Sequence, residues 1–126
     1  KMADLKVKMV LVNFWATSCS GCVAEMPELI TTYNQYQSQG LELVAVAMSY
    51  DPPSHVLNFS QKNKLPFPVM HDSFEEIASK FKDVRLTPTT YVIDKDGQII
   101  KQIIGVINFK ELTTLLDTEL KAKKAA

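Results

Sequence analysis

Apolar residues follow one another from position 9 to position 15, interrupted only by Asn13. A continuous apolar run of this length is typical of a β-strand that is buried on both faces. The pattern then changes, because from Ser20 to about Gln39 the apolar residues share one helical face, namely Cys22, Met26, Leu29, Ile30 and Tyr33. This spacing predicts a helix, and Gly40 supplies the residue type that commonly ends one.

A second strand is expected over residues 41–48, where the apolar positions first alternate and then run on. The strand–helix–strand unit formed with the first two elements has a long crossover. Strands joined by such a crossover pair in parallel, so we expect a parallel pair at the start of the sheet.

The middle of the chain predicts shorter elements. Two prolines precede a short helix near residues 54–64, and the proline-rich segment 66–70 suits a short edge strand. Ser73 is followed three residues later by Glu76, which fits a capping box and predicts another short helix.

The last third of the chain predicts a hairpin and a helix. Residues 89–94 and 98–104 are rich in β-branched side chains and are joined by Lys95-Asp96-Gly97, a hairpin turn signal. Asn108, with Glu111 three residues later, starts a final helix whose apolar stripe is Phe109, Leu112, Leu115, Leu116 and Leu120. The chain is therefore expected to form an α/β domain with a mixed central sheet and flanking helices.

Length and composition indicate the number of domains and argue against some classes of partner. At 126 residues the chain is expected to be one domain, 1–126. Its 14 basic and 14 acidic side chains balance, which gives no electrostatic case for nucleic acid or an anionic membrane. No apolar stretch approaches the roughly 20 residues of a membrane span, and no signal peptide is visible. Because the chain begins almost at a core strand, we expect it to be excised from a longer precursor that carries a signal or an anchor.

Cys19 and Cys22 are the only cysteines, and they directly follow the first strand. Two cysteines at the start of a helix are poised for thiol–disulfide exchange. The alternative is a stapling disulfide, but closing so short a loop removes little unfolded-state entropy. Near the helix N-terminus, Cys19 is expected to be a thiolate, whereas Cys22 lies on the apolar stripe and is expected to be a buried, resolving thiol. Chemistry alone does not choose between reduction and oxidation of a substrate.

Several motifs together resemble the thioredoxin superfamily: Asn13-Phe14-Trp15-Ala16, the Cys-x-x-Cys pair, Pro27, and Thr87-Pro88-Thr89-Thr90 before a strand. Within it, the chain is similar to the TlpA/ResA group of bacterial extracytoplasmic thiol–disulfide oxidoreductases. This resemblance implies a thioredoxin-like fold. The longer stretch between the second strand and Pro88 resembles the central insertion of TlpA-like and peroxiredoxin-like members.

The resemblance also assigns candidate site residues. It implies a cis peptide bond before Pro88 and pairing of the Thr87 backbone with an extended substrate segment by strand addition. Trp15, which packs near the dithiol in relatives, is grouped with the substrate-binding residues. The departures from relatives are Ser18, where many have an aromatic residue, and Ser20-Gly21, where many have a proline. Both departures put the reduction potential of the exposed cysteine in doubt.

Glu25 is the third candidate catalytic residue. It lies one helical turn after Cys22, where a carboxylate can relay a proton during resolution. Plain thioredoxins carry a buried aspartate where this chain has Asn13, and ResA-like members carry a glutamate at the position of Glu25. The alternative is a glutamate that only complements the helix dipole.

Neither metal nor cofactor is expected besides the redox-active pair itself. His55 and His71 are the only histidines, both distant in sequence from the cysteines, and no second closely spaced ligand pair exists for zinc. Val23 follows Cys22, so the C-x-x-C-H pattern of haem attachment fails. His71 beside Asp72 is interpreted as part of a surface turn rather than a pH-sensitive pair.

The sequence and the resemblance together predict a monomeric thiol–disulfide oxidoreductase that reduces protein disulfides outside the bacterial cytoplasm. The resemblance implies substrates such as apocytochrome c cysteines awaiting haem, and recharging by a membrane thiol carrier. Two alternatives stay open. One is a peroxiredoxin-like peroxide reductase, although Thr17 has the wrong offset from Cys19 for that motif. The other is a non-enzymatic thioredoxin-like binding module.

Overall fold

The computed structural model describes residues 9–81, 84 and 86–125. Its elements are, in chain order, β1 (Met9–Trp15), α2 (Ser20–Tyr36), the 3-10 helix η1 (Gln37–Gln39), β2 (Leu41–Ala47), α3 (Pro53–Lys62), β3 (Val69–His71), α4 (Glu76–Lys80), β4 (Thr89–Asp94), β5 (Ile99–Ile104) and α5 (Phe109–Ala125). This order is the one that the hydrophobic pattern predicts. Gly40 ends η1 in the left-handed conformation, at φ 107°.

The five strands form one mixed sheet in the order β3-β2-β1-β4-β5. β1 and β2 pair in parallel, as the crossover predicts, and β2 pairs in parallel with β3. β4 runs antiparallel to both of its neighbours, β1 and β5. The carboxyl ends of β1, β2 and β3 therefore meet at one edge of the sheet, where β4 begins. The segments that follow Trp15 and precede Thr89 are brought together there.

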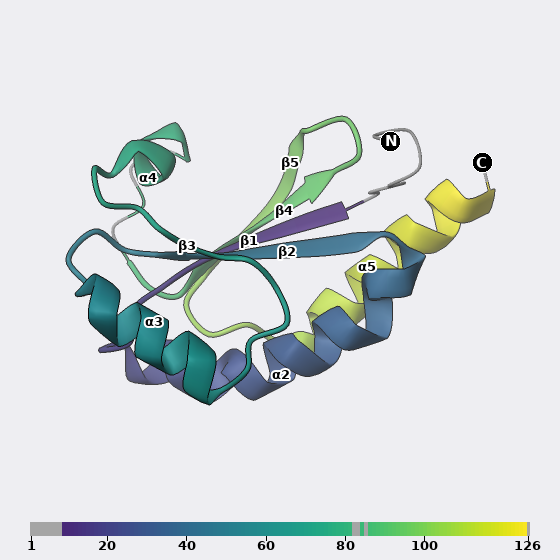
Figure 1. Ribbon diagram of the computed structural model, residues 1–126. Helices are drawn as coiled ribbons and strands as arrows, with labels where there is room; N and C mark the ends of the chain where they lie inside the picture. Colours follow the sequence, from purple (N-terminus) through teal and green to yellow (C-terminus); the bar gives the residue numbers. More distant parts are fainter. Residues whose placement is uncertain (1–8, 82–83, 85, 126) are drawn as a thin grey trace, which may run out of the picture.

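Helices cover the two faces of the sheet unequally (Figure 1). α2, α3 and α5 lie on one face, and α4 lies near the other face. Alternation along β1 fits this arrangement, since Met9, Leu11 and Trp15 join the core beneath α2 and α5, whereas Val12 and Phe14 join the second core with α4. Each fully buried side chain of this kind contributes roughly 1.5–3 kcal/mol of hydrophobic stabilisation.

The stretch between β2 and β4 contains the extra short strand and helix that the resemblance implies. β3 is an edge strand, as predicted, but it spans only Val69–His71, so Pro66 and Pro68 precede it and the strand itself contains no proline. α3 begins at Pro53 and ends at Lys62, within two residues of the expected bounds.

The predicted capping box at Ser73 is wrong. α4 begins at Glu76, and Glu75 precedes it in the left-handed region at φ 58° without a side-chain cap. The carboxylate of Asp72 instead accepts hydrogen bonds from the backbone N–H groups of Ile77 (3.0 Å) and Ala78 (2.8 Å). A buried carboxylate that accepts two N–H groups satisfies donors that the helix itself leaves unpaired, so Asp72 takes the role expected of Ser73.

Candidate active site

Cys19 and Cys22 form a disulfide at the amino end of α2, with their Cα atoms 5.2 Å apart. Cys19 is the N-cap residue of this helix, in an extended conformation with φ −90° and ψ 106°. Its Sγ accepts a hydrogen bond from the backbone N–H of Cys22 at 3.2 Å. The capping acceptor at such a position is usually a side-chain oxygen. Here the acceptor is the Cys19 sulfur, which lies at the positive end of the helix dipole, and this position favours a thiolate after reduction.

The two sulfurs occupy different environments. Cys22 is buried, with 1% of its surface exposed, in the same core as Met26 and Leu29. Cys19 is only partly buried and packs against the edge of that core. The predicted asymmetry between the two side chains is therefore confirmed at the level of burial. An accessible sulfur can meet a substrate, whereas the buried one can react only with a partner already bound to Cys19.

The peptide bond between Thr87 and Pro88 is cis, as the resemblance implies. Pro88 is buried beside the start of α2, and its carbonyl accepts a hydrogen bond from the N–H of Gly105 at 2.8 Å. This bond fixes the loop that precedes β4 to the segment that follows β5. Both segments thus lie next to Cys19.

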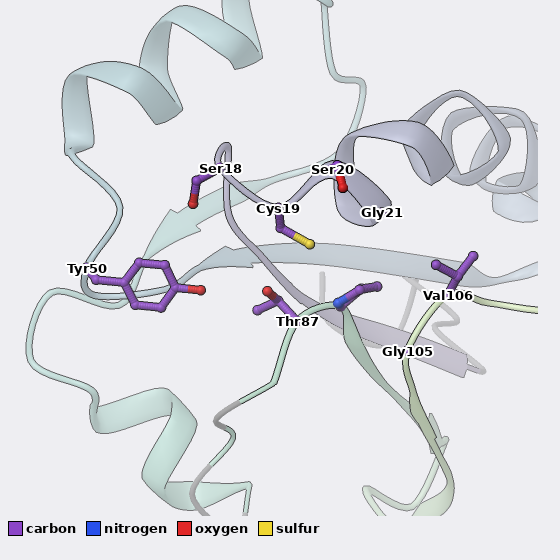
Figure 2. Close-up of a pocket in the computed structure, with 9 residues that line it drawn as sticks. Ser18, Cys19, Ser20, Gly21, Tyr50, Thr87, Gly105 and Val106 are labelled. Carbon is purple, nitrogen blue, oxygen red and sulfur yellow. The ribbon is translucent and has the colours of Figure 1, made fainter.

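A groove of about 560 Å³ runs over the disulfide, lined by Ser18, Cys19, Ser20, Gly21, Tyr50, Thr87, Pro88, Gly105 and Val106. Figure 2 shows the Cys19 sulfur in the middle of this groove, with Tyr50 at one end and Val106 at the other. Tyr50 is 59% exposed and Val106 is 63% exposed. Gly21 permits this shape, because a Cβ atom there would lie 3.1 Å from a methyl group of Val106.

Glu25 lies beneath the groove rather than in it. Its side chain is buried, with one carboxylate oxygen accepting the N–H of Ile107 at 3.0 Å and the other accepting Nδ2 of Asn13 at 3.4 Å. Burial raises the pKa of Glu25 above its ordinary value, and the two hydrogen bonds oppose that rise. A carboxyl group with a raised pKa, one turn from Cys22, has the property that a proton relay needs. The relay itself stays a prediction.

Trp15 does not line the groove. The indole is fully buried and packs against the ring of Phe59, with the ring centroids 5.1 Å apart. Its assignment to substrate binding stays a prediction. Trp15 belongs to the core that also contains Cys22 and supports the dithiol from within.

The two histidines lie in different places. His55 lines a separate shallow hollow beside Thr17, with Asn58, Phe59 and Lys62. His71 ends β3, and its ring is hydrogen-bonded to Ser73 Oγ at 2.8 Å and to the carbonyl of Asp51 at 2.6 Å. The interpretation of His71 and Asp72 as part of a surface turn is wrong, because His71 is the last residue of β3 and Asp72 is buried and caps α4.

Sequence reasoning missed Tyr50, Asp51, Gly105 and Val106. Tyr50 and Asp51 follow β2, and Gly105 and Val106 follow β5. For Tyr50 and Asp51 the available signal was topological, because residues just after the carboxyl ends of neighbouring parallel strands, here β1 and β2, commonly line a site. This signal does not cover Gly105 and Val106, because β5 pairs only with the antiparallel β4. Within residues 9–81, 84 and 86–125, no cluster of three or more His, Cys, Asp or Glu side chains could hold a metal, and no helix is long and apolar enough to cross a membrane.

Comparisons with known proteins give consistent matches. The Redoxin family model matches residues 1–116. The thiol-disulfide oxidoreductase ResA of Bacillus thuringiensis (strain Al Hakam) is 38% identical over 105 residues, covering 83% of this chain and 60% of that protein. ResA of Bacillus subtilis (strain 168) is 35% identical over 107 residues, covering 85% of this chain and 59% of that protein. The chain thus spans about 60% of the length of these curated relatives.

Two solved structures share the architecture. The solution structure of a thioredoxin-like protein from Neisseria meningitidis superposes with a TM-score of 0.87 at 37% identity, covering 98% of this chain and 82% of that one. The crystal structure of StoA from Bacillus subtilis gives a TM-score of 0.73 at 28% identity, covering 85% of this chain and 81% of that one. These superpositions confirm the expected fold class.

Proposed function

The chain belongs to the Redoxin family of the thioredoxin superfamily, and on that premise we propose that it is a thiol–disulfide oxidoreductase that uses Cys19 and Cys22. The observation that carries this proposal is the asymmetric pair at the start of α2. Cys19 caps the helix and opens to the groove, whereas Cys22 is buried behind it. The relatives named ResA support the same activity.

The exchange proceeds in two steps that conserve atoms and electrons. The Cys19 thiolate attacks one sulfur of a substrate disulfide, the substrate S–S bond breaks, and one substrate thiolate leaves. The Cys22 sulfur, after losing its proton, then attacks Cys19 in the mixed disulfide and releases the second substrate thiolate. The substrate gains two electrons and leaves as two thiolates, which take up the proton lost by Cys22 and one proton from solvent, and the Cys19–Cys22 disulfide forms. Run in reverse, the same steps oxidise a substrate dithiol.

Glu25 is proposed to accept the proton of Cys22 in the second step. Cys22 is buried, so its proton has no direct exit to solvent. The raised pKa of Glu25 brings that carboxyl group closer to the pKa of a thiol, which makes proton transfer between them less unfavourable. Asn13, which also contacts Glu25, cannot take a proton and is assigned only a hydrogen-bonding role.

The groove is proposed to hold an extended polypeptide segment along the Thr87–Pro88 backbone, by strand addition. On this basis the substrates are proteins with disulfides. The favoured direction, reduction, is proposed from the resemblance to the TlpA/ResA group. We further propose, from the resemblance to the TlpA/ResA group, a site of action outside the cytoplasm, recharging by a membrane thiol donor and a role in cytochrome c maturation.

Catalysed reduction of insulin disulfides by dithiothreitol tests the proposed activity. The wild-type chain should accelerate the reaction, whereas Cys19→Ser and Cys22→Ser should each abolish catalytic turnover. Ser79→Ala, an exposed residue of α4, serves as the control and should keep the wild-type rate. Insulin reduction at the uncatalysed rate would contradict the proposal. Rapid consumption of peroxide by the reduced protein would favour a peroxide reductase, and tight retention of a metal would favour a binding module.

A further inference from the structure

Asp51 is a buried carboxylate that the proposed exchange does not use. It is 2% exposed, yet its side chain lies within hydrogen-bonding distance of the loop that carries Cys19. The backbone N–H of Thr17 donates to Oδ2 at 2.7 Å, and the hydroxyl of Thr17 donates to Oδ1 at 2.6 Å. Hydrogen bonds to an ionised acceptor are short and strong, so one side chain holds Thr17 at two points.

Asp51 is itself held on both sides. Its backbone N–H donates to the carbonyl of Met48 at 3.1 Å, and its carbonyl is hydrogen-bonded to Nε2 of His71 at 2.6 Å. Thr17, Asp51 and His71 come from the carboxyl ends of β1, β2 and β3. The network therefore ties the three parallel strand ends into one base beneath the dithiol.

The position of Asp51 connects two sides of the groove. Thr17 lies two residues before Cys19, inside a tight turn closed by a hydrogen bond from the N–H of Cys19 to the carbonyl of Ala16 at 3.1 Å. Tyr50 directly precedes Asp51 and forms one end of the groove in Figure 2. Asp51 thus holds the turn that presents Cys19 and is adjacent in sequence to the aromatic residue at the end of the groove.

We propose that Asp51 is a positioning residue for Cys19. By holding Thr17, it keeps the turn in the conformation in which the sulfur of Cys19 accepts the N–H of Cys22 and faces the groove. This role rests on the proposed exchange at Cys19, because it concerns how that sulfur is presented.

The direction in which the pKa of Cys19 changes when Asp51 is removed distinguishes a positioning role from a simple charge effect. If the turn loosens, the sulfur loses the Cys22 N–H and the end of the helix dipole, so the pKa of Cys19 rises toward about 8.5, the value of a free cysteine. If Asp51 acted only through its negative charge, its removal would instead lower the pKa of Cys19, because the thiolate would be repelled less.

The test compares Asp51→Ala with Asp51→Asn in the reduced full chain. The rate of iodoacetamide labelling at Cys19 is followed against pH by mass spectrometry. Asparagine can accept the N–H of Thr17 and donate to its hydroxyl oxygen, so it keeps the geometry without the charge. We expect Asp51→Ala to raise the pKa of Cys19 by about one unit, which cuts the thiolate fraction below that pKa about tenfold. Asp51→Asn should not raise it.

Asp96→Ala, in the exposed turn between β4 and β5, is the matched control and should leave the labelling profile unchanged. An unchanged or lowered pKa in Asp51→Ala overturns the proposal, as does an equal rise in Asp51→Asn. If Asp51→Ala does not fold, variants of Thr17, the residue that Asp51 holds, provide the test. Thr17→Val, which loses only the hydroxyl contact, should raise the pKa of Cys19, whereas Thr17→Ser should match the wild type. Identical profiles for these two variants overturn the proposal.

This outcome is separable from that of the proposed function. Insulin reduction by the wild-type chain tests the activity and does not depend on Asp51. The labelling comparison measures the environment of Cys19 and is informative whether or not the wild-type chain reduces insulin.

Discussion

At the scale of single residues, burial and hydrogen bonding distinguish side chains of the same type. Cys19 and Cys22 are three residues apart, yet one caps a helix at the groove and the other is enclosed by the core. The same contrast separates Glu25, which is buried, from Glu28, which is exposed on the same helix. The chemistry assigned to each residue follows from this environment.

The raised pKa of Glu25 predicts a pH-dependent contribution to stability. In the unfolded chain the carboxyl group has its ordinary pKa of 4.5, whereas burial in the folded chain favours the protonated form. The free energy of unfolding should therefore fall as the pH rises from below 4.5 through the folded-state pKa. Glu25→Gln cannot ionise and should lack this loss. Urea unfolding of both chains across this range checks the prediction, and a difference that is constant with pH would contradict it.

Glu25→Gln should also slow the second step of the exchange. A glutamine cannot take the proton of Cys22, so the mixed disulfide should persist longer and the pH profile of reduction should change. Stopped-flow measurement of substrate thiol release, with Glu28→Gln as the control, checks this. An unaltered rate and pH profile in Glu25→Gln would rule the relay out.

The sequence predicted part of the site, for identifiable reasons. Cys19 and Cys22 are conspicuous because no other cysteine exists, and Pro88 is conspicuous because of its motif. Val106 and Asp51 are not conspicuous in the sequence, because a valine in a loop and an aspartate before prolines have many ordinary roles. Their part in the site depends on which strand ends meet, which the local pattern does not specify.

At the scale of elements, helix and strand starts were predicted best where one local signal dominated. The sequence predicts that Asn108 starts α5, and its side chain accepts the N–H of Glu111 at 3.2 Å. The predicted cap at Ser73 is wrong because a competing acceptor, the buried carboxylate of Asp72, caps α4 instead. Two adjacent residues with capping side chains cannot be ranked without knowledge of which one faces the helix.

Alanine variants of the two loop glycines should both lower stability, but only one of them should also lower activity. Gly105 and Gly97 have φ values of 95° and 82°, in the region that L side chains disfavour. Alanine at either position should lower the free energy of unfolding by about 1–2 kcal/mol. Gly105 also lines the groove and donates to Pro88, so only Gly105→Ala should slow insulin reduction beyond its effect on stability.

Urea unfolding and the insulin assay, carried out on both glycine variants, check this prediction. Equal loss of activity in Gly97→Ala and Gly105→Ala would contradict the assignment of Gly105 to the groove.

At the scale of the whole molecule, the sheet order explains why distant segments form one site. β1 lies between β2 and β4, so the segments after Trp15, after Ala47 and before Thr89 converge. The order of elements could be predicted from the hydrophobic pattern, and the parallel pairing from the long crossover. The edge position of β3 agrees with the expectation from Pro66 and Pro68, although both prolines precede the strand. The convergence of Tyr50, Val106 and Thr87 required the tertiary structure.

The proposed direction of exchange predicts the reduction potential of the whole protein. A reductant should have a potential near that of thioredoxin, about −270 mV, rather than near that of DsbA, about −120 mV. Equilibration with glutathione buffers, followed by alkylation and mass spectrometry, measures it. A value near the DsbA end would identify an oxidant and contradict the proposed direction while leaving the exchange mechanism intact.

The proposal that Cys19, rather than Cys22, attacks the substrate can be tested directly by finding which sulfur captures it. The reduced single-cysteine variants Cys22→Ser and Cys19→Ser are each mixed with a peptide disulfide, quenched with acid and mapped by mass spectrometry. We expect a stable mixed disulfide at Cys19 in the first variant and almost none at Cys22 in the second. Equal capture by the two variants, or faster capture by Cys22, would contradict it.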